Sequence, residues 1–249
     1  MHPFFQILLV SSYLFAQGNI FQDFKTEQNK YVRVREAYTE KETTLKQLCK
    51  DVQIPYPPKE IFIRIFKYDK ILELWVRSEQ ADSFVLFKEY KICASSGKLG
   101  PKRRQGDYQV PEGFYTINDF NPFSNFHLSL GINYPNESDR TLGVKGNLGG
   151  NIFIHGDCVT IGCIPITNDC IKEVYLMAVE AKASGQKQIP VHIFPTRFDK
   201  GAWIFQTYIN DKGLTKFWNN LKIGYEYFES HKRLPTISIK KDGSYQYGT

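Results

Sequence analysis

The sequence contains no apolar run long enough to cross a membrane, no internal repeat and no low-complexity tract. Its longest apolar run, residues 4–15, is about a dozen residues long, whereas a membrane-spanning helix needs about 20. The composition, with 42% hydrophobic and 15% aromatic residues, excludes a disordered chain. For 249 residues, we expect one folded domain of roughly 150 to 200 residues with extensions.

Cysteine is also scarce. The five cysteines are too few and too scattered for a disulfide scaffold, which a chain of this size does not need. Because their number is odd, an exported form of the protein keeps at least one thiol free or paired between chains. The cysteines are Cys49, Cys93, Cys158, Cys163 and Cys170.

The apolar run ends in Leu-Phe-Ala-Gln, a pattern typical of a secretory signal. We therefore predict that residues 1–17 are a signal peptide, cleaved near Ala16 or Gln17, and that the protein is exported to the periplasm. The alternative is a buried N-terminal strand. No cysteine follows the run directly, which argues against a lipoprotein anchor, so no stable membrane span is expected after cleavage.

The formal net charge is +6, and the densest basic cluster is Lys102, Arg103 and Arg104. A basic exported protein is attracted to the anionic polymers of the cell envelope, although most such charges are simply solvated. The sequence lacks the interleaved aromatic and basic residues of a nucleic-acid binder, so we predict no nucleic-acid partner.

Turn signals and apolar patterns predict a mainly β domain with an N-terminal helical extension at residues 18–58. Residues 39–42 read as a capping box that starts a helix, and three prolines from Pro55 to Pro58 end the extension. Strand-like segments follow at residues 61–66, 71–76, 84–94, 110–117, 126–132, 151–155 and 191–194.

Two helices are predicted in the second half of the chain. One begins at a cap within residues 167–169 and runs to about Ser184, and the other carries an apolar face along residues 214–225. The main domain is placed at residues 59–197. A C-terminal helical appendage follows at residues 198–249, and its tail from Pro235 looks weakly extended.

The segment at residues 151–169 concentrates a histidine and two cysteines between a strand and a helix. Together with Cys170 it offers four soft ligands, the number that a tetrahedral zinc site needs, but a second closely spaced pair is missing, so we expect no metal. A disulfide from Cys158 to Cys163 or Cys170 is possible. A buried, inert Cys163 with a hydrogen-bonded His155 is a further alternative.

The same segment also suits a cysteine nucleophile. The Gly162-Cys163 turn lies ahead of a helix, and its two amides could bind an oxyanion. His155 ends a strand and turns at Gly156, so a loop of seven residues can bring its ring back to the sulfur. A thiol activated in this way would react well below the free-thiol pKa of about 8.5.

His155-Gly156, followed by residues 160–164 with the sequence Thr-Ile-Gly-Cys-Ile, resembles the signature of the L,D-transpeptidase catalytic domain (YkuD) family. The short loop is similar to that of its YafK-like branch. Residues 106–115 resemble the Pro-x-Gly strand of the family, and residues 126–139 resemble a segment typical of the branch. The resemblance spans about residues 60–196.

The resemblance implies a mixed α/β, mainly β fold, a β-sandwich with a packed helix. It also implies an enzyme without a cofactor that cleaves the peptide bond after the L-centre of diaminopimelate, or a like residue, in peptidoglycan stem peptides through a thioester. Cys163 would be the nucleophile, His155 the general base and the Gly156 carbonyl the orienter of the imidazole. The Gly162 and Cys163 amides would bind the oxyanion. Candidates for substrate binding are Thr160, Ile161, His127, Tyr134 and Asn136.

The sequence departs from many family members at three points. Ile161 stands where a second histidine is common, Pro165 stands where Arg or Asn is common, and the loop before Cys163 is short. These departures leave open whether an amine or water takes the acyl group. The alternatives are a hydrolase that releases a D-amino acid or a wall-attached protein, and a catalytically silent wall-binding module.

Overall fold

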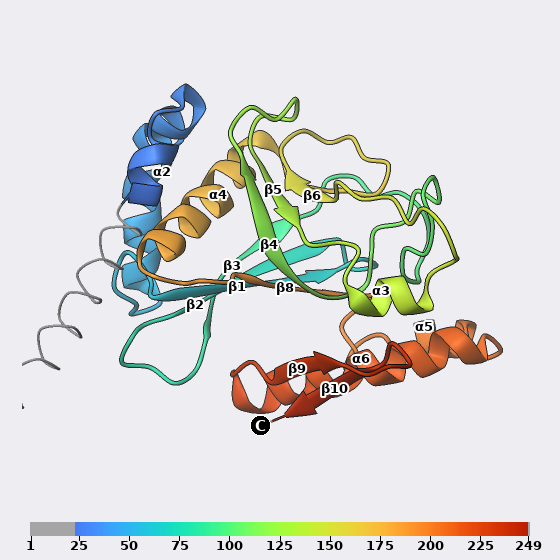
Figure 1. Cartoon of the computed structure of the whole chain (residues 1–249). Coiled ribbons are helices and arrows are strands. Elements are labelled where there is room, and N and C mark those ends of the chain that lie inside the picture. The colour runs from blue at the N-terminus through green and yellow to red at the C-terminus, as the bar shows by residue number, and fades with distance from the viewer. Residues whose placement is uncertain (1–22, 249) are drawn as a thin grey trace, which may run out of the picture.

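The computed structural model describes residues 23–248, and the predicted signal peptide lies outside them. Eight strands form one curled sheet in the order β3-β2-β1-β8-β4-β5-β6-β7 (Figure 1). In chain order they are β1 Glu60–Phe66, β2 Ile71–Arg77, β3 Val85–Lys91, β4 Gly113–Asn121, β5 Ser129–Ile132, β6 Phe153–His155, β7 Ile164–Pro165 and β8 Pro190–Phe194.

Strand β4 joins the two halves of the sheet. Its first residues, from Gly113, pair with β8, and its later residues, up to Asn121, pair with β5. The register shifts between Ile117 and Asp119, where an irregularity lets the strand bend. The sheet therefore folds over on itself, which confirms the predicted mixed α/β, mainly β fold.

The centre of the sheet is buried on both faces. Along β1, Ile61, Ile63 and Ile65 belong to the main core, whereas Phe62 and Phe66 pack into aromatic clusters on the opposite face. Alternate side chains of a strand point to opposite faces, so this nearly continuous apolar run is what a strand covered on both sides requires.

Helix α4 (Asn168–Ala183) covers the main-core face, and helix α2 (Val32–Asp51) lies outside it (Figure 1). The cap predicted within residues 167–169 is Thr167, whose hydroxyl accepts a hydrogen bond from the Cys170 amide at 3.3 Å. The predicted capping box at residues 39–42 is wrong. Thr39 lies inside α2, where its hydroxyl donates to the carbonyl four residues earlier instead of to an amide at a helix start.

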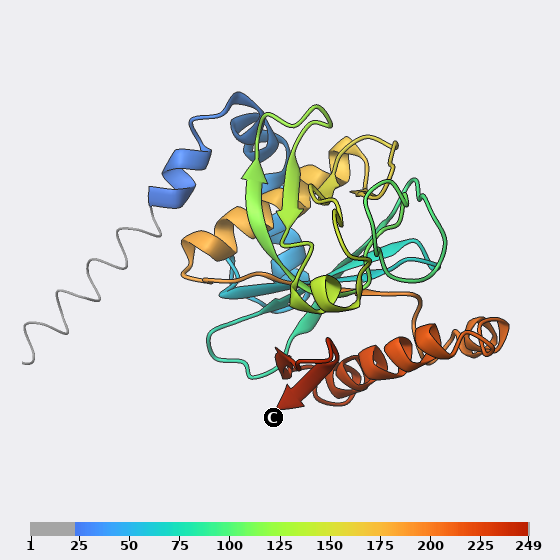
Figure 2. The same ribbon diagram turned by 45° about the vertical axis from the view of Figure 1, so that its right-hand side comes forward.

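The C-terminal segment packs on the other face of the sheet (Figure 2). The tail predicted to be weakly extended is a hairpin, whose Tyr245 is 3% exposed and accepts a hydrogen bond from Asn136 at 3.0 Å. The appendage is therefore not purely helical. Its elements are α5 Ala202–Thr207, α6 Lys212–His231, β9 Thr236–Ile239 and β10 Tyr245–Gly248, and the short helix α3 Glu137–Leu142 lies in the sheet domain. None of the helices in residues 23–248 is long and apolar enough to span a membrane.

His192 on β8 is a neutral histidine within the aromatic face. Its ring lies 4.6 Å from the rings of Phe62 and Phe114, and among the described residues its Nδ1 has no hydrogen-bond partner. Burial, reinforced by the charge of Arg64, lowers the pKa of His192 from its usual 6.5 to about 3. At mildly acidic pH, the unfolded chain therefore binds a proton at His192 that the folded protein does not bind.

We expect His192 to weaken the protein in acid. At His192 the unfolded chain takes up a proton near pH 6.5 and the folded protein only near pH 3. The contribution of the neutral histidine to stability is therefore fully present above pH 6.5 and is lost as the pH falls from 6.5 toward 3. At pH 5 the loss is about 2 kcal/mol. In urea unfolding, the loss of stability between pH 7 and pH 5 should be smaller by about that amount in His192→Leu than in the unaltered protein. Equal losses in both proteins would contradict this.

Candidate active site

Strands β6 and β7 bring His155 and Cys163 together. The two strands are parallel, with Ile154 beside Ile164 and His155 beside Pro165. Cys163 directly precedes β7 and therefore lies beside Phe153, two residues from His155 along the same face. With strands about 4.8 Å apart and a rise of about 3.3 Å per residue, the two Cα atoms are roughly 8 Å apart. This separation is short enough for an imidazole to reach a thiol.

The imidazole of His155 is fixed by its surroundings. It is 1% exposed, the carbonyl of Gly156 hydrogen-bonds its Nδ1, and the ring of Phe126 lies 4.6 Å away. Since a carbonyl only accepts, the proton sits on Nδ1 and Nε2 keeps a free lone pair. Burial lowers the pKa of His155, so the ring is neutral at pH 7 and suited to accept a proton.

The thiol of Cys163 is half-buried and protonated at rest. Burial raises its pKa, against the opposing effects of the Phe153 amide and the positive charge of Lys102. Its Sγ lies 3.6 Å from the Asn151 carbonyl. The expectation of a thiol that reacts well below its ordinary pKa is therefore not supported. The thiol of Cys163 and the imidazole of His155 are therefore both neutral at rest.

The loop ahead of Cys163 is closed by Thr160. Its hydroxyl donates to the Cys163 carbonyl at 2.8 Å and accepts from the Gly162 amide at 3.1 Å. This corrects one prediction, because the Gly162 amide is engaged within the loop and is not free for an oxyanion. Gly162 itself is required, since its φ is +136° and a Cβ there would lie 3.2 Å from the Gln109 carbonyl. Ile161 is 76% exposed at the tip of this loop.

Three candidate substrate residues are buried or half-buried. Tyr134 is 6% exposed, and its hydroxyl donates to the Leu148 carbonyl at 3.1 Å. Asn136 caps helix α3 through a complete capping box. His127 is half-buried. Burial lowers its pKa, and the positive charges of Lys172 on α4 and Arg33 on α2 lower it further. The geometry thus gives Tyr134 and Asn136 structural roles.

The structure pairs Cys158 with Cys93, not with Cys163 or Cys170. The two Cα atoms are 5.4 Å apart, and the bridge spans 65 residues of sequence. It ties the loop after His155 to the segment after β3, whose Cys93 amide also donates to the Pro165 carbonyl at 3.0 Å. Spacing alone could not identify Cys93 as the partner. The bridge leaves Cys163 free.

We expect this disulfide to stabilise the folded protein by about 2–4 kcal/mol, because it restricts a long loop of the unfolded chain. A Cys93→Ser/Cys158→Ser variant should lose about that free energy of unfolding in urea. Dithiothreitol should lower the unfolding midpoint of the unaltered protein toward that of the variant and leave the variant unchanged. A reductant effect of equal size in both proteins would contradict the pairing.

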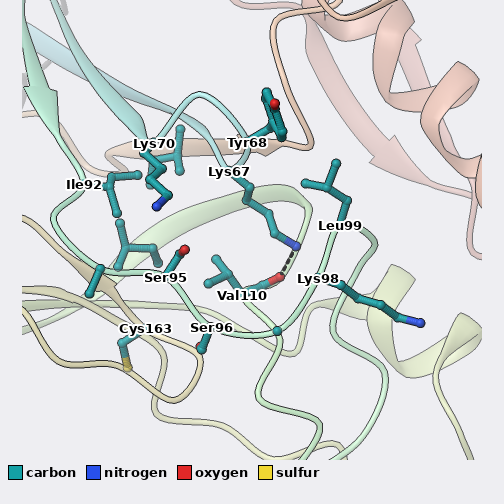
Figure 3. Close-up of a pocket in the computed structure, with 14 residues that line it drawn as sticks. Lys67, Tyr68, Lys70, Ile92, Ser95, Ser96, Lys98, Leu99, Val110 and Cys163 are labelled. Carbon is teal, nitrogen blue, oxygen red and sulfur yellow. Dashed lines mark hydrogen bonds between the residues drawn. The ribbon is translucent and has the colours of Figure 1, made fainter. Parts of the chain in front are cut away.

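A cavity of about 220 Å³ opens beside Cys163 (Figure 3). One wall is the segment after β3, and another is the β1–β2 hairpin with Lys67. The Lys67 ammonium holds this wall together, since it donates to the carbonyls of Gly100 and Val110 at 2.7 and 2.8 Å and pairs with Glu112 at 3.0 Å. His155 is not among the lining residues. Sequence reasoning missed Lys67, because the segments that meet here are distant in the chain.

The C-terminal appendage supports this wall. Glu112 is fully buried and accepts a hydrogen bond from the indole of Trp218 on α6 at 2.7 Å. It also accepts one from the Gly100 amide at 2.8 Å. Among residues 23–248 there is no group of three or more histidine, cysteine or acidic side chains arranged to hold a metal ion.

Comparisons with known proteins show a family and relatives to which the chain is similar. The L,D-transpeptidase catalytic domain (YkuD) family matches residues 61–193. The chain is 40% identical over 181 residues to YafK of Escherichia coli strain K12, a proposed L,D-transpeptidase, in an alignment that covers 72% of this chain and 70% of that protein.

Two solved structures are also similar. Pgp2, the helical cell shape determining protein of Campylobacter jejuni, aligns over 73% of each chain with 21% identity and a TM-score of 0.44. Bd1075 of Bdellovibrio bacteriovorus aligns over 78% of this chain and 86% of its own, with 18% identity and a TM-score of 0.40.

Proposed function

The chain belongs to the L,D-transpeptidase catalytic domain family, and on this premise we propose that it is a periplasmic cysteine enzyme acting on peptidoglycan stem peptides. The observation that carries the proposal is the β6–β7 pairing, which sets a buried neutral histidine on the same face as a free thiol, and this thiol lines an open cavity. The Cys93–Cys158 disulfide supports an oxidising compartment such as the periplasm.

The proposed reaction has two steps. The sulfur of Cys163 attacks the carbonyl carbon after the L-centre of diaminopimelate while Nε2 of His155 takes the thiol proton. The peptide C–N bond then breaks, the proton passes to the departing amine, and a thioester remains. An incoming amine then attacks the thioester carbonyl carbon, the C–S bond breaks and a proton of the amine returns to the sulfur, which restores the thiol and gives transpeptidation.

Hydrolysis is the second candidate, because Pro165 is buried in β7 where many family members carry Arg or Asn. Without that polar side chain, an amine acceptor has one contact fewer. Water would then take its place at the thioester and release a D-amino acid or a wall-attached protein.

One experiment separates these outcomes. The protein is incubated with purified muropeptides that end in a D-amino acid, with and without an added D-amino acid amine, and the products are analysed by mass spectrometry. Transpeptidation incorporates the added amine, whereas hydrolysis adds water. Unchanged muropeptides under all conditions, with binding retained, would indicate a wall-binding module and would reject the proposal.

A further inference from the structure

The cavity beside Cys163 is positively charged. Among residues 23–248, the charged residues that line it are Lys67, Lys70 and Lys98, and none of the lining residues in that range is acidic. Lys67 is neutralised by Glu112 at 3.0 Å, and Figure 3 shows Lys98 extending away from the other lining side chains. The positive charge left in the cavity is therefore that of Lys70.

Lys70 has no carboxylate partner within residues 23–248. It ends the turn between β1 and β2, with a φ of +54° that a glycine would adopt without strain. The nearest acid in sequence, Asp69, is engaged, since it accepts hydrogen bonds from the Thr196 hydroxyl at 2.8 Å and the Arg197 amide at 3.1 Å. The Lys70 ammonium is thus available to an external anion.

A second donor lies on the same side of the cavity. Figure 3 shows the Ser95 hydroxyl and the Lys70 ammonium both directed into the space between the β1–β2 hairpin and the segment after β3. An ammonium and a hydroxyl that converge in this way match the two oxygens of a carboxylate. Lys70 and Ser95 are both exposed, so a ligand can reach them from solvent.

We propose that Lys70, assisted by Ser95, binds a carboxylate of the stem peptide and so positions the peptide for attack by Cys163. This inference rests on the proposed function, because it takes the stem peptide as the ligand. A stem peptide carries several carboxylates, at its terminal D-amino acid, on the diaminopimelate side chain and on its glutamate. All of them share the chemistry that Lys70 would recognise.

The test measures binding without turnover. Isothermal titration calorimetry measures the affinity for a synthetic stem that ends in diaminopimelate and a D-amino acid. Two proteins are compared, both carrying Cys163→Ala: one retains Lys70 and the other carries Lys70→Gln. We expect Lys70→Gln to weaken binding roughly tenfold. A series of stems in which each carboxylate in turn is replaced by a carboxamide identifies the group. With the matching carboxamide, both proteins should bind equally.

The matched control is Lys91→Gln, which removes the same charge from the neighbouring strand. Lys91 is exposed and pairs across the sheet with Ile71, next to Lys70. The affinity of the Lys91→Gln protein for the synthetic stem should equal that of the protein with Lys91. Equal affinity of Lys70 and Lys70→Gln, a deficit that persists with every carboxamide, or no saturable binding would overturn the inference. Absence of turnover in the protein with Cys163, together with the Lys70 effect on binding, would instead reject the proposed reaction and leave this carboxylate site in place.

Discussion

Replacing Cys163 by serine is expected to lower kcat/KM for a muropeptide ending in a D-amino acid roughly 10⁴-fold or more. Serine has nearly the same size, but its hydroxyl is a far weaker nucleophile than a thiol whose proton is removed by histidine. The surrounding loop should remain intact, because Thr160 bonds to the backbone of residue 163 and not to its sulfur. The measurement is product formation by mass spectrometry.

The thioester gives a second readout of the same change. The intact mass of the unaltered protein should rise by the mass of the acyl stem during turnover, whereas Cys163→Ser should show no such adduct. Cys170→Ser is the matched control, since Cys170 is also a free, half-buried thiol but lies in the first turn of α4. Retained turnover in Cys163→Ser would reject the thioester route.

The strands and the main helix could be predicted because their signals are local. The apolar run of β1 predicts a strand, and the capping residues at 167–169 ahead of an apolar helical face predict the start of α4. The same local reasoning failed at Thr39, where a capping pattern occurs inside a longer helix. That helix begins after Tyr31, which offers no side-chain cap. Tertiary packing against α4 therefore outweighs the local signal.

The contents of the site were harder to predict because they depend on contacts between distant segments. The pairing of Cys158 with Cys93 bridges 65 residues, and spacing within residues 151–169 contains no information about it. The protonated state of Cys163 depends on burial, which the sequence does not give. In contrast, the strand that ends at His155 and the glycine turn ahead of Cys163 are local signals. From them the sequence predicts a loop that folds back toward His155, which agrees with the pairing of β6 and β7.

Replacing His155 by asparagine is expected to lower kcat/KM roughly 10²–10⁴-fold and to change the shape of its pH profile. Burial lowers the pKa of His155 and raises that of Cys163. In the unaltered protein the base form is present above the lowered histidine pKa, so the rate should rise as the pH passes up through a value below 6.5 and then stay level through neutrality.

Without the histidine, only a thiol that has already ionised can attack. The residual rate of His155→Asn should therefore keep rising with pH through the raised pKa of Cys163, above the ordinary thiol range. His231→Asn is the matched control, because His231 is exposed at the end of α6 and its Nδ1 bonds to the Tyr227 carbonyl of its own helix. Its profile should coincide with that of the unaltered protein. If the rate of His155→Asn were still independent of pH near neutrality, another group would be the base. The pairing of strands β6 and β7 would then account for the fold of this loop but not for its chemistry.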